Sequence, residues 1–400
     1  MASIGLDITD DYIAVHVEQS ETVLIKPAVI GCEKDGSAWY VGEDAYRAAL
    51  NGTGVITDGL LTLLGKDGVK ELGGEQYTAM ELLSRLLSML IEKALKDENA
   101  CEATHVTAAL HTADKELFDR VAACLMKMGY GEDEVTVISH SEAFMYFVLS
   151  QDRSFYVGNV ALFDLGDGVL SFYEFSIQRG TGRQHVKCTC TGEEGFRTEI
   201  LRTDTGKNLG DRIMTETAKR HMEGKVFSTV FLTGSGFSKT EWAGEFVSYT
   251  CHRRKLMLEE GIFAIGASLA ADEKIADYIL SCDTRISSEL SMMVEIKGRD
   301  TELLLIPEGE RWHNLRLMAE VMPCGQDYID FIVTPHGLNA EKQRRRAMLT
   351  GFPEREDRTL RLCVEIGTVS AKAVKITISD MGFGDIFPPS GAVLCEEIEV

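Results

Sequence analysis

The sequence predicts an α/β protein in which a duplicated, two-lobed domain precedes a smaller all-β domain. A strand, a polar turn and a second strand open the chain, and the same pattern restarts near residue 160. Helices and further strands follow each of these two hairpins. From about residue 287 short strands with apolar alternation replace the helical pattern. We therefore expect a first domain at 1–284, with lobes at about 1–150 and 151–284, and an all-β domain at 285–400.

The first lobe is expected to begin with a three-stranded meander. Apolar residues alternate through 4–18 on both sides of a polar turn, and 23–30 has the composition of a third strand. Thr78 and Glu81 have the spacing of a capping box, and leucines continue an apolar helical face to Leu95. The later elements expected in this lobe are a strand at 106–110, a helix at 114–128, a strand at 135–138 and a helix at 141–149.

The second lobe and the all-β domain are expected to follow the same kind of pattern. In the second lobe the expected elements are strands at 160–164 and 169–176, a helix at 206–222, a strand at 226–233 and helical segments to about 280. In the last domain, apolar and polar residues alternate at 360–366 and 374–378, which is typical of half-buried strands.

Charge and composition exclude several classes of function. Lys and Arg number 41 and Asp and Glu number 63, so the formal charge is −22 and disfavours binding to nucleic acid or to an anionic membrane. The basic run formed by Lys342 and Arg344, Arg345 and Arg346 is expected to be a solvated surface turn. No segment has the roughly 20 apolar residues that span a bilayer, and no signal peptide is evident. We therefore expect a cytoplasmic protein with reduced thiols.

One cysteine group has metal-like spacing. His185, Cys188 and Cys190 lie close together in the sequence, but a convincing fourth ligand is missing. We expect a structural role for this group rather than a zinc site.

Three turns carry the residue types that phosphate chemistry requires. Asp164-Leu165-Gly166-Asp167-Gly168 offers a carboxylate at a strand end, which can hold Mg²⁺, and glycines that let backbone N–H groups approach phosphate. Asp7-Ile8-Thr9-Asp10 offers the carboxylates without a glycine. An apolar strand that runs into Gly234-Ser235-Gly236 leaves room for a flat ring or a ribose.

In their order and separation these motifs resemble the actin and DnaK-type (seventy-kilodalton heat-shock chaperone) ATPase superfamily, over roughly residues 3–275. Segment 7–10 corresponds to the first phosphate loop, 164–168 to the second and 233–237 to the adenosine-contacting turn. Segments 139–143 and 262–270 resemble the two connecting helices, and 206–211 resembles the actin segment that follows the second loop. The resemblance implies a duplicated actin-like (ribonuclease-H-like) two-lobed ATPase fold.

The resemblance also implies ATP and Mg²⁺ as cofactors. Asp7 and Asp164 would flank the metal through water, and Glu142 and Asp164 would order the attacking water, so that Asp7, Glu142 and Asp164 are the catalytic candidates. The residues expected to contact the nucleotide are Thr9, Asp10, Gly166, Asp167, Gly168, Gly234, Ser235 and Gly236.

The last domain resembles the peptide-binding β-sandwich of DnaK-type chaperones. Segments 303–333 and 348–378 have the alternation of its strands, and the helical lid of that family has no counterpart before Val400. The resemblance implies a peptide or protein partner, which could add to the edge of a sheet.

Three departures from the family pattern predict weak or lost ATP hydrolysis. Thr9 and Asp10 stand where the family has Gly and then Thr or Ser. The place of the catalytic lysine falls on Leu61, with Lys66 nearby. The subdomain that clamps the base, expected after 206–211, is reduced or absent. Phosphoryl transfer depends chiefly on positioned charge, so each loss matters.

Four functions remain open at this point. The first is a DnaK-like chaperone-type protein that binds ATP·Mg and a peptide or partner protein. The second is a non-catalytic pseudo-ATPase that acts as an interaction or scaffold protein. The third is an actin-like filament protein, which the charge of −22 opposes. The fourth is a sugar kinase, for which no substrate-side aspartate is evident.

Overall fold

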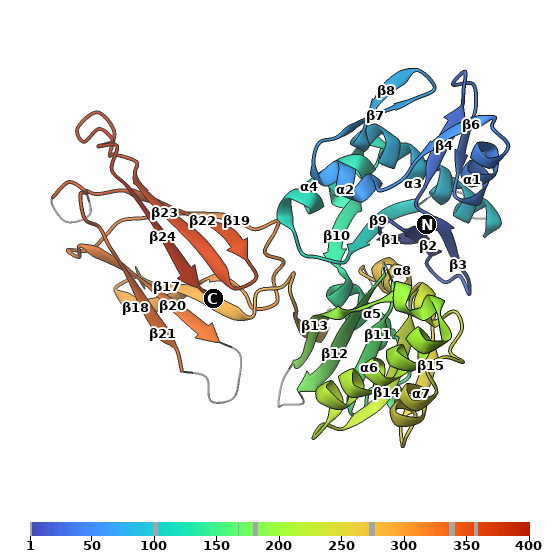
Figure 1. Cartoon of the computed structure of the whole chain (residues 1–400). Helices are drawn as coiled ribbons and strands as arrows, with labels where there is room; N and C mark the ends of the chain where they lie inside the picture. The colour runs from blue at the N-terminus through green and yellow to red at the C-terminus, as the bar shows by residue number, and fades with distance from the viewer. Residues whose placement is uncertain are drawn as a thin grey trace. The chain divides into compact units, whose positions relative to one another are not determined.

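A computed structural model of the chain describes residues 2–98, 103–166, 168–178, 183–271, 277–335, 341–355 and 359–400 (Figure 1). It has a mixed α/β architecture with several sheets. The chain divides into two units, residues 1–278 and 279–400, and the short strand β16 (Tyr278–Ser281) spans the division. In the described part of the chain, no helix has the length and apolar character needed to cross a bilayer.

The first half of residues 1–278 is built on a five-stranded sheet with the order β10-β9-β1-β2-β3. The first three strands form the expected antiparallel meander, and β9 and β10 extend it in parallel with β1. Their bounds are β1 (Ala2–Ile8), β2 (Tyr12–Val17), β3 (Val23–Pro27), β9 (Ala103–Leu110) and β10 (Val135–Ser139). The third strand is shorter than expected and ends at Pro27, because proline has no N–H for the ladder.

Three helices of this half begin where the sequence predicts. Thr78 caps α3 (Ala79–Asp97) in a reciprocal capping box with Glu81, and the leucine face of α3 is buried against the sheet. Asp114 caps α4 (Lys115–Lys127), and Ser139 caps α5 (His140–Ser150). The helix predictions at 78–95, 114–128 and 141–149 are therefore confirmed.

Small elements are inserted between β3 and α3. The strands β4, β5 and β6 form a three-stranded sheet, and β7 and β8 form a hairpin. The bounds of the inserted elements are β4 (Ile30–Glu33), β5 (Trp39–Val41), α1 (Glu43–Leu50), β6 (Gly54–Thr57), α2 (Leu60–Gly65), β7 (Val69–Leu72) and β8 (Glu75–Thr78).

The second half repeats this strand order in five strands of its six-stranded sheet, as β15-β14-β11-β12-β13. Again three strands form an antiparallel meander and two further strands run parallel to the first of them. The bounds are β11 (Asn159–Asp164), β12 (Val169–Gln178), β13 (Gln184–Arg197), β14 (Phe227–Thr233) and β15 (Lys255–Leu258). The helices are α6 (Asp204–Met222), α7 (Gly244–Thr250) and α8 (Ile262–Ser268).

Helical segments were expected after 236 to about 280, and this expectation is wrong at β15. Its sequence, Lys-Leu-Met-Leu, consists of good helix formers, but pairing with β14 makes it an edge strand. Short 3-10 helices complete this unit, namely Glu132–Glu134, Arg153–Phe155, Thr198–Arg202 and Ser235–Phe237.

The two halves meet through close contact between main chains of β1, α5 and α8. A Cβ atom at Gly266 of α8 would lie 1.9 Å from the carbonyl oxygen of Ala143 in α5. A Cβ atom at Gly5 of β1 would lie 1.9 Å from the carbonyl oxygen of Ala264. Only glycine permits such approaches, and they fix how the connecting elements pack.

Residues 279–400 contain two four-stranded antiparallel sheets, with the orders β18-β17-β20-β21 and β19-β22-β23-β24. The alternation at 360–366 and 374–378 is confirmed by the strands β22 and β23. The bounds are β17 (Ser288–Ile296), β18 (Arg299–Ile306), β19 (Arg316–Val321), β20 (Tyr328–Pro335), β21 (Gln343–Met348), β22 (Leu362–Ser370), β23 (Ala373–Asp380) and β24 (Val393–Glu399).

The basic run Arg344–Arg345–Arg346 lies in the edge strand β21, so the expected surface turn is wrong. Pairing with β20 places Arg346 opposite Asp330, to which its guanidinium donates hydrogen bonds of 2.8 and 3.1 Å. The same guanidinium lies 3.6 Å from the ring centre of Tyr328. These cross-strand contacts stabilise an extended conformation that the charge run alone does not predict.

Candidate functional site

Polar side chains gather where strands of both halves of residues 1–278 end. Asp7 lies near the end of β1, and Asp164 ends β11. His111 directly follows β9, and His140 directly follows β10 as the first residue of α5. Because β1, β9 and β10 run parallel, their carboxyl ends share one edge of the first sheet.

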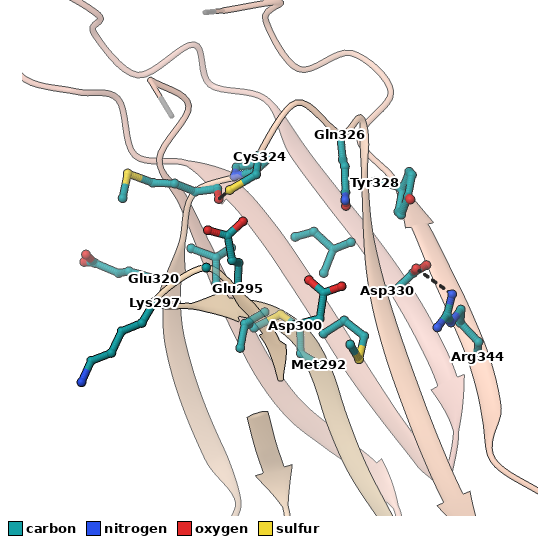
Figure 2. A pocket seen from close by; sticks show the side chains of 17 residues that line it. Met292, Glu295, Lys297, Asp300, Glu320, Cys324, Gln326, Tyr328, Asp330 and Arg344 are labelled. Carbon is teal, nitrogen blue, oxygen red and sulfur yellow. Dashed lines mark hydrogen bonds and ion pairs between the residues drawn. The ribbon is translucent and has the colours of Figure 1, made fainter. Parts of the chain in front are cut away.

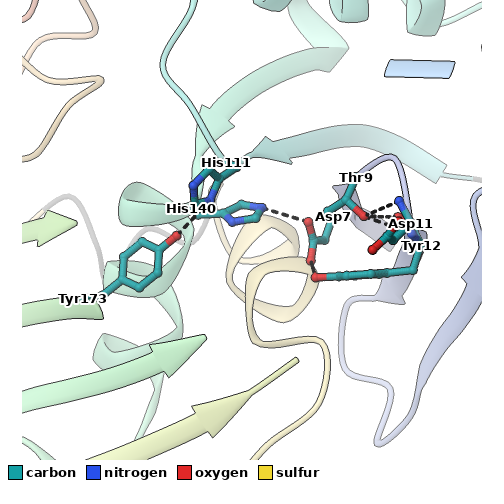
Figure 3. Close-up of polar contacts among 7 residues, drawn as sticks. All are labelled: Asp7, Thr9, Asp11, Tyr12, His111, His140 and Tyr173. Atoms are coloured by element: carbon teal, nitrogen blue, oxygen red, sulfur yellow. Dashed lines mark hydrogen bonds and ion pairs between the residues drawn. The ribbon is translucent and has the colours of Figure 1, made fainter. Parts of the chain in front are cut away.

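Asp7 is the hub of this group and is almost fully buried, at 1% exposure. Its Oδ1 lies 2.8 Å from Nε2 of His140, and its Oδ2 accepts a hydrogen bond of 2.8 Å from the hydroxyl of Tyr12 (Figure 3). Both carboxylate oxygens are thus engaged by side chains of the protein itself.

The first turn, between β1 and β2, is held together by its own side chains. The hydroxyl of Thr9 accepts a hydrogen bond of 2.9 Å from the main-chain N–H of Tyr12 and donates one of 2.9 Å to its carbonyl. Asp10 reaches α2, where it accepts hydrogen bonds of 2.9 and 3.1 Å from the N–H groups of Leu61 and Thr62 and another from the Thr62 hydroxyl. Asp10 therefore caps α2, since carboxylates satisfy the exposed N–H groups of a helix start.

The second and third turns lie against one another. Leu165 donates its N–H to the carbonyl of Thr233 at 2.9 Å and accepts a hydrogen bond of 3.0 Å from the N–H of Gly236. A Cβ atom at Gly234 would lie 2.5 Å from the nitrogen of Gly166, and one at Gly236 would lie 2.3 Å from Cδ2 of Leu165. These glycines thus permit the two turns to touch.

The first turn lies beside the second. A Cβ atom at Gly166 would lie 3.7 Å from the Tyr12 ring and 3.1 Å from a carboxylate oxygen of Asp164. Gly168 has φ of +71°, which favours glycine. The structure therefore brings the three turns singled out in the sequence together, although Asp167 lies outside the described residues.

The remaining candidates lie at varied distances from this centre. Glu142 is fully buried in the first turn of α5, and its carboxylate accepts a hydrogen bond from the Tyr146 hydroxyl. Ser235 is exposed at the start of its 3-10 helix. Lys66 is exposed at the end of α2, whereas Asp10 caps the start of that helix.

The sequence did not single out four side chains of this site: His111, His140, Tyr12 and Tyr173. His140 stacks on Phe263 of α8, with ring centres 3.8 Å apart. Nδ1 of His111 lies 3.3 Å from the hydroxyl of Tyr173 on β12. Burial, and secondly the neighbouring His140, lower the pKa of His111 to about 4, although part of its side chain is exposed. One signal was available, because each histidine lies within two residues of the end of a predicted strand, at 106–110 and at 135–138.

His111, His140 and Asp164 form the one group of possible metal ligands in the part of the chain that the structure describes. Each offers one ligand atom, and these three atoms lie within 4.8 Å of one another. His185, Cys188 and Cys190 lie instead along β13, where Cys188 is buried and Cys190 is exposed.

Residues 279–400 contain a separate cavity of about 710 Å³ (Figure 2). Its walls come from β17, the starts of β18 and β20, Arg344 of β21, and the segment that follows β19. Met293 and Met322 line it, and the carboxylates of Glu295 and Asp300 face its interior (Figure 2). Charged side chains make up a large share of the lining, namely Glu295, Lys297, Asp300, Glu320, Asp330 and Arg344.

Comparison with known families gives two matches along the chain. Residues 11–283 match the family described as "Family of unknown function (DUF5716) C-terminal". Residues 285–400 match the domain described as "Domain of unknown function (DUF8552)". The first match covers more than half of the chain, so the chain belongs to the DUF5716 C-terminal family. Comparison with curated proteins gives no match.

Proposed function

We propose that this protein is a divergent member of the actin and DnaK-type superfamily that does not hydrolyse ATP and acts as an interaction protein. In this proposal residues 1–278 form a stable scaffold, and residues 279–400 hold an extended peptide or a segment of a partner protein. The observation that carries the proposal is the engagement of both carboxylate oxygens of Asp7 by His140 and Tyr12.

The topology supports the assignment to the superfamily. Two sheets share one strand order, each with an antiparallel meander followed by two parallel strands. The helices α5 and α8, which end the two halves, pack closely at Gly266. A duplicated sheet whose turns face one another at the strand ends is the arrangement that the resemblance implies.

The contacts of the first turn argue against a bound polyphosphate. Thr9 and Asp10 have local partners, namely the main chain of Tyr12 and the start of α2. His140 and Tyr12 already engage both oxygens of Asp7, which leaves fewer of its lone pairs for Mg²⁺ or its waters. Only the residues 223–226 connect α6 to β14, which leaves no space in the sequence for a base-clamping subdomain there.

The cavity in residues 279–400 supports a role in holding a partner. A peptide could lie in it with apolar side chains against Met293 and Met322 and basic side chains against Glu295 and Asp300. A strand could instead add to β18 or β21, which are edge strands of their sheet.

Thermal melting with and without millimolar ATP·Mg²⁺ tests the loss of nucleotide binding. A ligand at 100 times its dissociation constant stabilises a protein by about 2.7 kcal/mol, which is easily measured. We expect no shift of the melting temperature for the full chain. A saturable shift that Asp164→Ala abolishes would overturn the proposal and restore the ATPase interpretation.

Binding of the full chain to an array of unstructured peptides tests the second half of the proposal. We expect Met322→Asp, in the cavity, to lose the bound peptides. The matched control is Met318→Asp, since Met318 is an exposed methionine of β19 outside the cavity lining and should leave binding unchanged. Equal binding by wild type and both variants, or no peptide bound at all, would contradict a partner site in this cavity.

A further inference from the structure

His111, His140 and Asp164 bring two imidazoles and a carboxylate together, an arrangement that nucleotide binding does not explain. Its three ligand atoms lie within 4.8 Å of one another, and they come from the ends of three different strands. His140 and Asp164 are 2% and 6% exposed, so two of the three members of this group are buried, whereas His111 reaches the surface. Buried polar clusters of this kind are stable when a partner compensates their desolvation.

The surroundings of the two imidazoles match those of metal ligands. Histidine ligands usually donate their second ring N–H to a carboxylate or another oxygen, which fixes the ring orientation. The Nε2 atom of His140 lies 2.8 Å from Asp7, which assigns Nδ1 as its coordinating atom. In the tautomer with its proton on Nδ1, His111 donates to Tyr173 at 3.3 Å and coordinates through Nε2 (Figure 3).

The contact between Asp7 and His140 is therefore a carboxylate–histidine pair of the type found behind metal ions. Tyr12 holds the second oxygen of Asp7, and the ring of Phe263 lies flat against His140 at 3.8 Å. These two contacts restrict both members of the pair. A ligand that is already oriented loses less entropy when it binds an ion.

The donor set indicates which ion fits. Two imidazole nitrogens and one carboxylate oxygen suit Zn²⁺ and its first-row neighbours, whereas Mg²⁺ and Ca²⁺ prefer oxygen ligands throughout. Zinc bonds of about 2.0–2.1 Å place tetrahedral ligand atoms about 3.3 Å apart, so atoms that now lie up to 4.8 Å apart would approach one another on binding. His111 is the exposed member of the group and provides a path for the ion to enter.

We propose that His111, His140 and Asp164 bind one first-row transition-metal dication, with Zn²⁺ as the preferred ion. Asp7 acts as a positioning residue behind His140. With three ligands from the protein, the ion keeps one position for water or for an oxygen of another molecule. The ion joins strand ends of the first sheet to a strand end of the second, so it stabilises the contact between the two halves.

The test is a titration of the full chain with Zn²⁺ against a chromogenic chelator, after dialysis against EDTA. We expect saturable binding of one ion per chain. His111→Ala should weaken it by more than tenfold, and Asp7→Asn should weaken it by about 10- to 100-fold, as expected for an outer partner of a ligand. The matched control is His105→Ala, because His105 is an exposed histidine of β9 that should contribute nothing.

A second readout separates coordination from a purely structural role. Co²⁺ bound by this group should give visible absorption bands that His111→Ala abolishes and His105→Ala preserves. Circular dichroism of each metal-free variant checks that the fold persists. Equal Zn²⁺ affinity for wild type and His111→Ala would overturn the proposal. Melting of the zinc-free chain with ATP·Mg²⁺, after dialysis has removed the EDTA, does not depend on this result, so the proposed loss of ATP binding is tested separately.

Discussion

The two halves of residues 1–278 have one strand order but organise their turns by different means. In the first half, the hydroxyl of Thr9 and the carboxylate of Asp10 satisfy N–H groups of the turn and of α2. In the second half, Gly166 and Gly168 shape the turn through the main chain. The comparison teaches that a repeated topology does not conserve turn chemistry. A turn closed by its own side chains has fewer groups to offer to a ligand.

The helices that precede the fourth strand of each half differ in the same way. Thr78 caps α3 and Thr203 caps α6. The third residue of α3 is Glu81, which completes a capping box. The third residue of α6 is Gly206, where a Cβ atom would lie 1.8 Å from the carbonyl oxygen of Ile200. The first half thus relies on a side-chain contact where the second half relies on close main-chain packing.

The largest expected effect comes from filling the close contact between the last helices of the two halves. Gly266→Ala should destabilise residues 1–278 by about 3 kcal/mol, because the added methyl group would lie 1.9 Å from the carbonyl oxygen of Ala143. Helix propensity alone predicts the opposite sign, a gain of about 1 kcal/mol. Urea unfolding measures which effect dominates.

The control for this change is Gly244→Ala in α7, where a Cβ atom would meet nothing within 4 Å. Here propensity acts alone, so we expect the stability to be equal or slightly higher. A stabilised Gly266→Ala variant would show that the two halves pack less closely than described.

An intermediate effect is expected when the side-chain closure of the first turn is removed. Asp10→Ala should destabilise the protein by about 1 kcal/mol, the usual penalty for the loss of a helix cap. The midpoint of urea unfolding reports it. Asp11→Ala serves as the control, since Asp11 is exposed at the next position and should change stability by less than about 0.5 kcal/mol. Equal loss of stability in Asp10→Ala and Asp11→Ala would mean that the side chain of Asp10 does not hold the first turn to α2.

The smallest effect concerns the capping box of α3 and depends on pH. Hydrogen bonds from the N–H and hydroxyl of Thr78 lower the pKa of Glu81. A carboxyl with a lowered pKa stabilises the folded state above its unfolded pKa of about 4.3, and this contribution is lost as the pH falls through the folded pKa. Glu81→Gln should therefore destabilise the protein more at pH 7 than at pH 3.

The equivalent helix of the second half provides the comparison for this pH effect. The cap of α6 is the hydroxyl of Thr203, which does not titrate in this range. The penalty of Thr203→Ala should be the same at pH 7 and pH 3. Parallel pH dependence for both substitutions would mean that Glu81 does not act through its charge.

The regular elements of the first unit could be read from the sequence because their signals are local. Helix caps such as Thr78 and Asp114 precede apolar periodicity, and buried strands are short apolar runs. The strand β15 could not, since its residues favour helix and only pairing with β14 makes it a strand. The arginines of β21 are a similar case, because Asp330 lies on another strand.

The candidate site was predictable only in part for a related reason. The order of Asp7, Asp164 and Gly234 indicates that three turns belong together. The role of Asp10 depends on α2, whose capped residue Leu61 lies 51 positions further along the chain. The proximity of His111 and His140 depends on β9 and β10 being neighbours in parallel. Neither the contact of Asp10 with α2 nor the proximity of the two histidines follows from a local sequence pattern.

The close contacts at Gly5 and Gly266 have a consequence for motion. Side chains at an interface can change rotamer and so let two packed elements slide past one another. Main chains that are in direct contact, as at Gly5 and Gly266, can move relative to one another only if the elements separate. The amide hydrogens of β1, α5 and α8 should therefore exchange with solvent as one cooperative group, at a rate set by global unfolding rather than by local opening. The two halves would then unfold as one cooperative unit, and they would not open and close about a hinge.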